Sequence, residues 1–193
     1  MSRKESGFTL IELIVVITII GLAITLATPS WDQVTQKRKL TSAAEQVAAL
    51  LVVAQSEAQK RNQAVSLAFN RTGNQSWCVG AVLSASGCDC RVTDSSSAQF
   101  CTIDGTPHRL AATSFNSLNL LEAMDTQPGG GDSYITFDPV RGILQPPGDK
   151  LQLTFDTTGG YYSLRMIIGP TGLIRICNPD ADKAVGGYGA CTS

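Results

Sequence analysis

The sequence predicts an α+β protein in which a long N-terminal helix packs on a C-terminal head of antiparallel β-sheet. Three observations support this class. Residues 8–27 are almost wholly apolar, residues 40–58 carry apolar side chains at helical spacing, and short β-prone runs separated by turn residues follow from residue 65. With 193 residues, 43% of them hydrophobic, the chain is long enough for one domain with a core and an appended element.

The first element is the apolar run FTLIELIVVITIIGLAITLA, which occupies residues 8–27. As a helix rising about 1.5 Å per residue, this run matches a hydrocarbon core of about 30 Å. It is longer than the apolar core of a signal peptide, and no A-x-A cleavage site follows it. Arg3 and Lys4 precede it, which predicts a cytoplasmic leader and a single membrane-spanning helix that crosses outward.

One carboxylate, Glu12, interrupts the apolar run. A carboxylate inside a spanning helix costs roughly 2.5–3.5 kcal/mol on insertion scales, so it is usually functional or paired. The alternative is that Glu12 lies near the membrane interface and extends its carboxylate to water. Further along, Pro29 removes a helical hydrogen bond and is expected to kink or locally melt the helix.

The second half of the helix is amphipathic. Its apolar residues recur at spacings of three and four and form one stripe, namely Leu40, Ala44, Val47, Leu51, Ala54 and Ala58. Polar residues such as Glu45 and Gln46 mostly lie off this stripe. The pattern predicts that the helix continues to about Arg61.

The rest of the chain is expected to form short strands. The β-prone runs cover residues 65–69, 77–83, 134–137, 151–155, 163–168 and 173–177. Turn residues separate them at 72–74, 127–131, 145–148 and 158–160. This arrangement predicts antiparallel sheets packed on the helix.

The chain has six cysteines, none of them in the helical region: Cys78, Cys88, Cys90, Cys101, Cys177 and Cys191. An even number in a loop-rich region beyond a membrane segment predicts disulfides in an oxidising compartment. Cys88 and Cys90 are too close to pair easily, so each is expected to bond to Cys78 or to Cys101, in an order that the sequence leaves open.

The C-terminal pair, Cys177 and Cys191, encloses a loop rich in Gly, Asp and Ala. A disulfide there would close a segment that has little core of its own, and it would contribute roughly 3 kcal/mol in the chain-entropy model.

A zinc site is the alternative use of the other four cysteines, with His108 as a further ligand. The C-x-C spacing of Cys88 and Cys90 is not the usual zinc spacing, and an exported protein favours disulfides. His108 is the single histidine and has no nucleophile-elbow context, so no catalytic site is predicted. We therefore expect neither an enzyme nor a metal or other cofactor. The net charge of −1 and the pI of about 5.8 give no general affinity for nucleic acid.

The N-terminal residues SGFTLIE, at positions 6–12, resemble the prepilin peptidase site of type IV pilins and of type II secretion pseudopilins. The resemblance implies cleavage between Gly7 and Phe8, N-methylation of Phe8, and an assembly role for Glu12. Cleavage creates an α-amino group on Phe8, which Glu12 of a neighbouring subunit can neutralise, so each buried charge gains a partner only on assembly. Gly21 and Pro29 resemble the helix-loosening positions of this superfamily.

The resemblance also implies a type IV pilin fold and a domain order. Residues 1–7 would be a cleaved leader, residues 8–34 a transmembrane and filament-core helix, and residues 35–193 a periplasmic head. The protein would reside in the bacterial inner membrane as a single-pass protein and then in a surface pilus. Its partners would be the prepilin peptidase, other minor pilins and the major pilin. Pilin C-terminal loops are often closed by a disulfide, which agrees with a Cys177–Cys191 bond.

Three short motifs in the head are similar to the GspH/FimT family, which contains secretion pseudopilins and minor pilins of the FimU and FimT types. They are AQSEA at 54–58 with the following Arg61 and VSL, FDPVRG at 137–142, and GLIRIC at 172–177. Gln55 stands where many members have arginine. This departure is expected to matter little for the fold, and an altered contact between subunits is the alternative effect.

The family resemblance implies a structural, non-enzymatic minor pilin of the FimU type, placed near the pilus tip and helping to prime assembly. A type II secretion minor pseudopilin is the first alternative. The second is a DNA-binding pilin of the FimT type, which is associated with a G-R-x-R motif. Residues 172–175 read GLIR, so Leu173 replaces one arginine and Arg175 alone remains. DNA is therefore a disfavoured partner.

Overall fold

The structure, a computed structural model, describes residues 8–115, 118–124, 133–145 and 150–192, and the side chains of all of these except 25–30 and 121–124. The chain divides into two compact units, Met1–Gln36 and Lys37–Ser193. The single long helix α1, Leu10–Arg61, contributes to both units. Gly21 and Pro29 lie within α1, and the kink expected at these positions stays a prediction.

In the first unit, α1 carries apolar side chains on every side. Within the described residues, no helix is both long enough and apolar enough to cross a membrane.

In the second unit, the amphipathic stripe of α1 is buried as predicted. Leu40, Ala44, Val47, Leu51, Ala54 and Ala58 are all fully buried, and Ala43 and Leu50 join them. The helix ends at Arg61 because Asn62 adopts a left-handed conformation with φ of 51°. The N–H groups of Asn62 and Gln63 then bond to the carbonyls of Gln59 and Ala58 at 3.4 and 3.2 Å. This pattern is a Schellman motif, in which the last carbonyls of the helix find partners.

In the part of the head that the structure describes, the strands form two larger antiparallel sheets and one hairpin. The five-stranded sheet has the order β5-β2-β1-β7-β8, with β1 at Val65–Gly73, β2 at Ser76–Val82, β5 at Arg109–Ala111, β7 at Ser133–Phe137 and β8 at Leu144–Gln145. The four-stranded sheet has the order β11-β10-β9-β6, with β6 at Leu118–Met124, β9 at Leu151–Thr157, β10 at Ser163–Ile168 and β11 at Ile174–Cys177. The hairpin joins β3, Thr102–Ile103, to β4, Thr106–Pro107, and a 3₁₀ turn η1 covers Ala112–Ser114.

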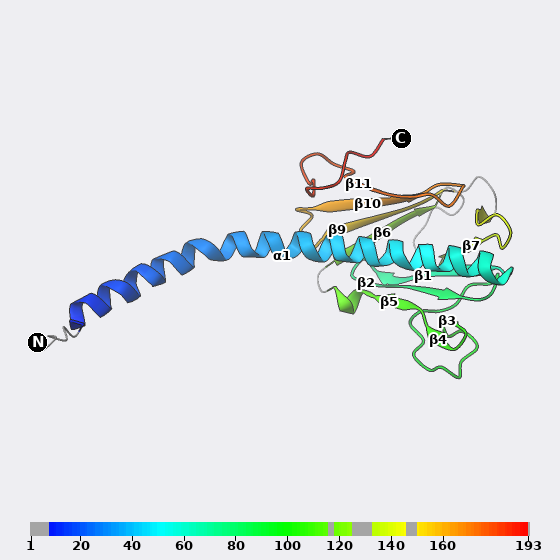
Figure 1. Ribbon diagram of the computed structural model, residues 1–193, viewed down its shortest axis with the longest axis horizontal. Coiled ribbons are helices and arrows are strands. Elements are labelled where there is room, and N and C mark those ends of the chain that lie inside the picture. The colour runs from blue at the N-terminus through cyan, green and yellow to red at the C-terminus, as the bar shows by residue number, and fades with distance from the viewer. Residues whose placement is uncertain (1–7, 116–117, 125–132, 146–149, 193) are drawn as a thin grey trace, which may run out of the picture. The chain divides into compact units, whose positions relative to one another are not determined.

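One core joins the head part of α1 to both sheets. In Figure 1, β9 and β10 are drawn above this part of α1, and β1 and β2 are drawn below it. Strand β9 shows the expected alternation, because Leu151, Leu153 and Phe155 are fully buried and the residues between them are not. Trp77 stacks on Phe115 and meets Phe155 edge-on, each at 6.0 Å between ring centroids. The predicted α+β class is confirmed.

The predicted strands agree with the observed ones to within a few residues, with one extension. Strand β1 runs on to Gly73, so the turn predicted at 72–74 begins with Asn74. The sequence did not predict β3, β4, β5, β6 or β8. The turn at 127–131 lies outside the described residues, as does the turn at 145–148 except for Gln145, which is the last residue of β8.

Candidate functional site

The described N-terminus begins with a reciprocal pair of contacts around the start of α1. The backbone N–H of Glu12 faces Oγ1 of Thr9 at 3.4 Å, and the N–H of Thr9 faces Oε2 of Glu12 at 3.5 Å. A Thr and a Glu three residues apart form the capping box, which gives two unpaired N–H groups of a helix start a partner. Gly7, the predicted cleavage residue, lies outside the described residues, whereas Phe8 is 88% exposed.

The apolar surface that follows is uncovered within the described residues. Leu10, Leu13 and Leu22 are each more than 60% exposed, at 76%, 62% and 68%. A helix that is apolar on all sides is normally buried, either in lipid or among other helices. The single acidic side chain on this apolar stretch is Glu12, and its carboxylate has only Thr9 as a partner among the described residues.

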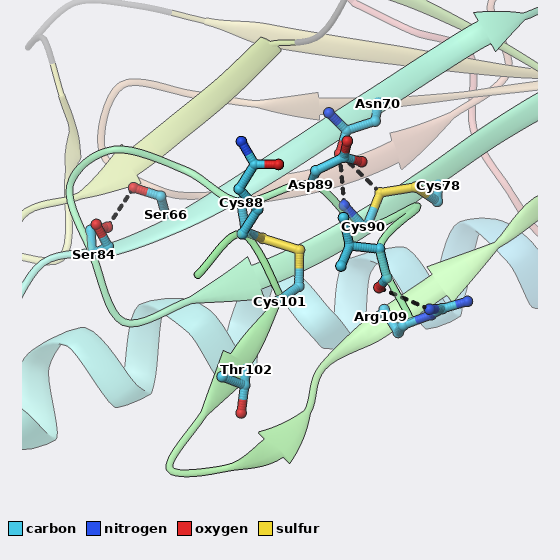
Figure 2. The surroundings of a disulfide bond; sticks show 12 residues. Ser66, Asn70, Cys78, Ser84, Cys88, Asp89, Cys90, Cys101, Thr102 and Arg109 are labelled. Carbon is cyan, nitrogen blue, oxygen red and sulfur yellow. Dashed lines mark hydrogen bonds between the residues drawn. A yellow bond between two sulfur atoms is a disulfide. The ribbon is translucent and has the colours of Figure 1, made fainter. Parts of the chain in front are cut away.

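Two disulfides fix the loop 83–101 against the five-stranded sheet. Cys78 bonds to Cys90, and Cys88 bonds to Cys101, which settles the order that the sequence left open. Figure 2 shows both bonds beside the strands that carry Ser66, Asn70 and Cys78. A Cβ on Gly80 would lie 2.8 Å from Cβ of Cys101, so only glycine lets the loop approach β2 this closely.

These bonds occupy the sulfur atoms that the zinc hypothesis required. His108 lies between β4 and β5, where its backbone pairs with Ala81 and with Cys101. Within the described residues, no three His, Cys, Asp or Glu side chains are placed together to hold a metal ion.

The C-terminal loop is closed by the disulfide expected between Cys177 and Cys191. Inside it, the buried side chain of Asn178 accepts a hydrogen bond from the N–H of Val185 at 2.9 Å and donates to the carbonyls of Val185 and Tyr188 at 3.1 and 2.6 Å. The hydroxyl of Tyr188 also donates to Oε1 of Glu45 on α1 at 2.9 Å. Burial, together with the neighbouring Glu45, raises the pKa of Tyr188. The loop is thereby held on the helix.

Two turns meet Gln55 of α1, and both use a left-handed glycine. Nε2 of Gln55 donates to the carbonyl of Gly142 at 2.7 Å. Gly142 has a φ of 66° and Gly172 a φ of 79°; a Cβ on Gly172 would collide with the Gln55 side chain, and a Cβ on Gly142 would collide with Gln59, one helical turn further on. The residue that departs from the family pattern therefore makes a contact within the head.

The turn that contains Gly142 is organised by Asp138. Its Oδ1 accepts hydrogen bonds from the N–H groups of Arg141 at 2.7 Å and Val140 at 2.9 Å, and Gln145 donates to Oδ2 at 3.0 Å. The backbone N–H of Arg141 is the main reason that the pKa of Asp138 lies below its usual range.

An ion-pair chain links the end of α1 to the β3–β4 hairpin. The guanidinium of Arg61 contacts Glu57 and Asp104, each at 2.5 Å. The pKa of Arg61 is raised mainly by the hydrogen bond to Glu57, and the hydrogen bond to Asp104 raises it further. Arg61, one of the family-pattern residues, therefore has a structural role in the head.

The candidate DNA contact, Arg175, lies on β11 and is exposed. The side chain that stands in for the second arginine, Leu173, is 73% exposed. Sequence reasoning missed Thr9, Asn178 and the structural role of Gln55. The T-x-x-E spacing of residues 9–12 is a signal that could have identified Thr9.

Known protein families match two parts of the chain, the N-terminal segment and the head. The family model described as type II transport protein GspH matches residues 43–172, and the prokaryotic N-terminal methylation motif matches residues 2–28. Two curated relatives, each a fimbrial protein of Pseudomonas aeruginosa, are 36% identical over 66 residues, which is 34% of this chain. The match spans 43% of the length of these relatives.

Two solved structures resemble the chain in fold. The type IV minor pilin FimU of Pseudomonas aeruginosa has a TM-score of 0.50 and 20% identity, with 80% of this chain and 97% of that one covered. The minor pseudopilin EpsH from the type 2 secretion system of Vibrio cholerae has a TM-score of 0.50 and 12% identity, with 73% and 98% covered.

Proposed function

Because the chain belongs to the GspH family of minor pilins and pseudopilins, we propose that it is a structural, non-enzymatic minor pilin of a type IV pilus. It enters the filament near the tip and helps to prime assembly with other minor pilins and the major pilin. One observation carries the proposal: α1 begins with an uncovered apolar surface that contains a single carboxylate, and this surface lies within the residues that match the methylation motif.

The apolar surface needs two successive environments in this proposal. Before assembly, residues 8–34 lie in the bacterial inner membrane with the head in the periplasm, and the prepilin peptidase cleaves after Gly7. After assembly, the same residues pack among neighbouring helices in the filament. Both environments exclude water from side chains such as Leu10 and Leu13, which explains why this part of α1 is apolar on every side.

In this proposal, Glu12 aligns neighbouring subunits when the helix moves from the membrane into the filament. Among the residues that the structure describes, its carboxylate contacts only the start of its own helix, at Thr9. In the filament it pairs with the α-amino group of a neighbour's Phe8. Leaving one of these charges unpaired in an apolar interior costs about 3–5 kcal/mol, so the pair forms only when the subunits are aligned.

The substitution Glu12→Ala tests this function. We expect cleavage after Gly7 to remain nearly intact and the amount of protein in sheared pili to fall by about two orders of magnitude, as a loss of about 3 kcal/mol implies. Asp32→Ala is the matched control, because it removes an exposed carboxylate from the same helix. Normal incorporation of the Glu12→Ala protein would refute the pairing.

A minor pseudopilin of type II secretion is the second candidate, and the GspH match and the likeness to EpsH favour it. Sheared surface fibres and secreted proteins distinguish the two. A minor pilin is recovered in sheared pili, and its deletion removes pili while secretion continues. A pseudopilin gives the reverse result. A role in DNA binding is disfavoured, because Arg175 stands alone and the net charge is −1.

A further inference from the structure

A cleft of about 450 Å³ lies between the five-stranded sheet and the disulfide-tethered loop 83–101. Its floor is the face of β1 and β7 opposite to the core, since Leu67 and Phe69 belong to the core and Ala68 and Asn70 alternate with them. We call it the loop cleft. Its volume is within the range of about 300–1,000 Å³ that is typical of small-molecule sites.

Asn70 supplies an unused pair of N–H donors to this cleft. The residue is only 4% exposed, and its Oδ1 accepts a hydrogen bond from the N–H of Cys90 at 2.9 Å, which fixes the orientation of the amide group. No described residue accepts a hydrogen bond from Nδ2. Asn70 lines this cleft and also a second pocket that contains Cys78, and Figure 2 draws its amide nitrogen on the side on which Cys88 lies. Every enclosed side-chain nitrogen or oxygen among the described residues has a hydrogen-bond partner, so Nδ2 is open to solvent and can donate to a ligand in the cleft.

Tyr134 supplies an aromatic wall. It belongs to β7, where it pairs with Ala68, and it is 49% exposed. Gly87 of the loop supports the ring: its φ is 73°, and a Cβ there would lie 3.0 Å from the ring carbon Cγ. The loop therefore lies against one side of the ring, and the ring presents both an apolar surface and a hydroxyl group.

The cleft has no unpaired charge to offer a ligand. Asp89 is the one acidic residue among the described residues that line the cleft, and Arg91 holds both carboxylate oxygens at 2.8 and 2.9 Å and thereby lowers the pKa of Asp89. None of these lining residues is Lys, Arg or His. Gln99 adds an amide group that can both donate and accept. An ionic ligand would lose its hydration without gaining an opposite charge.

We propose that the loop cleft binds a neutral saccharide. A sugar ring has C–H faces that pack on an aromatic side chain and hydroxyl groups that accept and donate hydrogen bonds. Tyr134 is placed for the first contact, and Asn70 and Gln99 for the second. The two disulfides hold the loop and the sheet in register, so the cleft exists before the ligand arrives and little ordering is needed on binding.

Saturation-transfer NMR on the full chain, purified in a detergent without a sugar head group, tests the proposal. The probes are D-glucose, D-galactose, N-acetyl-D-glucosamine and lactose at millimolar concentration, with D-glucuronate as the anionic analogue of glucose. We expect transfer to at least one neutral sugar and affinity for glucuronate about tenfold weaker than for glucose, since its charge is unpaired in the cleft.

Two variants and one control connect the signal to the cleft. Tyr134→Ala removes the aromatic wall, and Asn70→Asp keeps the acceptor for Cys90 but removes the donor, so each is expected to weaken binding about tenfold or more. Tyr161→Ala removes a tyrosine that is 67% exposed elsewhere and should leave binding unchanged. If Asn70→Asp fails to fold, Tyr134→Ala alone decides. No transfer to any neutral sugar, equal binding of glucuronate, or binding that survives Tyr134→Ala would overturn the proposal.

Discussion

Replacing Gly172 by alanine tests how the two head turns pack on α1. Gly172 has a φ of 79°, and a Cβ there would lie 2.8 Å from the carbonyl oxygen of Gly142 and would collide with Gln55. The left-handed backbone costs an alanine about 1–2 kcal/mol, and displacing Gln55 forfeits a hydrogen bond worth about 0.5–1.5 kcal/mol. Alanine regains about 0.4–1 kcal/mol from a less flexible unfolded chain. With the backbone collision added, we expect a net loss of about 2 kcal/mol.

Urea unfolding of the detergent-solubilised chain with its disulfides intact measures this loss. Gly186→Ala is the control, because no atom lies within 4 Å of its Cβ position, and it should change stability by less than about 0.5 kcal/mol. Gln55→Ala removes the same hydrogen bond, so the double variant with Gly172→Ala should lose about 1 kcal/mol less than the two single losses combined. Equal stability of the Gly172 and Gly186 variants, or strict additivity, would refute the proposed packing.

Three further predictions concern processing, cross-linking and pH. Gly7→Ala should leave the leader attached, because the peptidase must approach the backbone there; an intact mass that lacks the leader would show that the site is misassigned. Replacing Cys177 and Cys191 together by Ser should cost roughly 3 kcal/mol in a urea titration, and alkylation of the native protein without reductant should label no cysteine. The backbone N–H of Arg141 lowers the pKa of Asp138, so the carboxylate stabilises the fold above its unfolded-state pKa of about 3.9, and this stability is lost as the pH falls through the lower folded value. Asp138→Asn should therefore be less stable than the parent at neutral pH, with the gap closing in acid; a gap that is independent of pH would contradict this.

The sequence predicted helices and strands correctly where the pattern lies within a short stretch of the chain. The stripe from Leu40 to Ala58 is buried because its spacing matches a helix, and the alternation in β9 is as plain. Strand β6 escaped prediction because its sequence, LNLLEAM, favours a helix, and it becomes a strand through pairing along β9 from Thr157 to Leu151. Strands of two residues, such as β3 and β8, are too short to show alternation.

The functional residues show the same contrast: local motifs were predicted from the sequence, and contacts between distant residues were not. The N-terminal motif lies within a few consecutive residues, and both its match to the methylation motif and the family resemblance of the head are confirmed. The order of the disulfides depends on how the loop folds back against β2, where Cys90 and Cys101 lie beside Gly80, and spacing alone does not encode this. Asn70 and Tyr134 are 64 positions apart in the chain, and only sheet pairing brings their strands together.

The side chain of Asn178 holds the backbone of the C-terminal loop in place, and this affects how freely the loop sequence can change. Its three hydrogen bonds all go to backbone atoms, and most side chains between Pro179 and Ala184 are exposed. The path of the loop therefore does not depend on what those side chains are. The exposed surface of this loop can therefore change in sequence while its backbone keeps the same path.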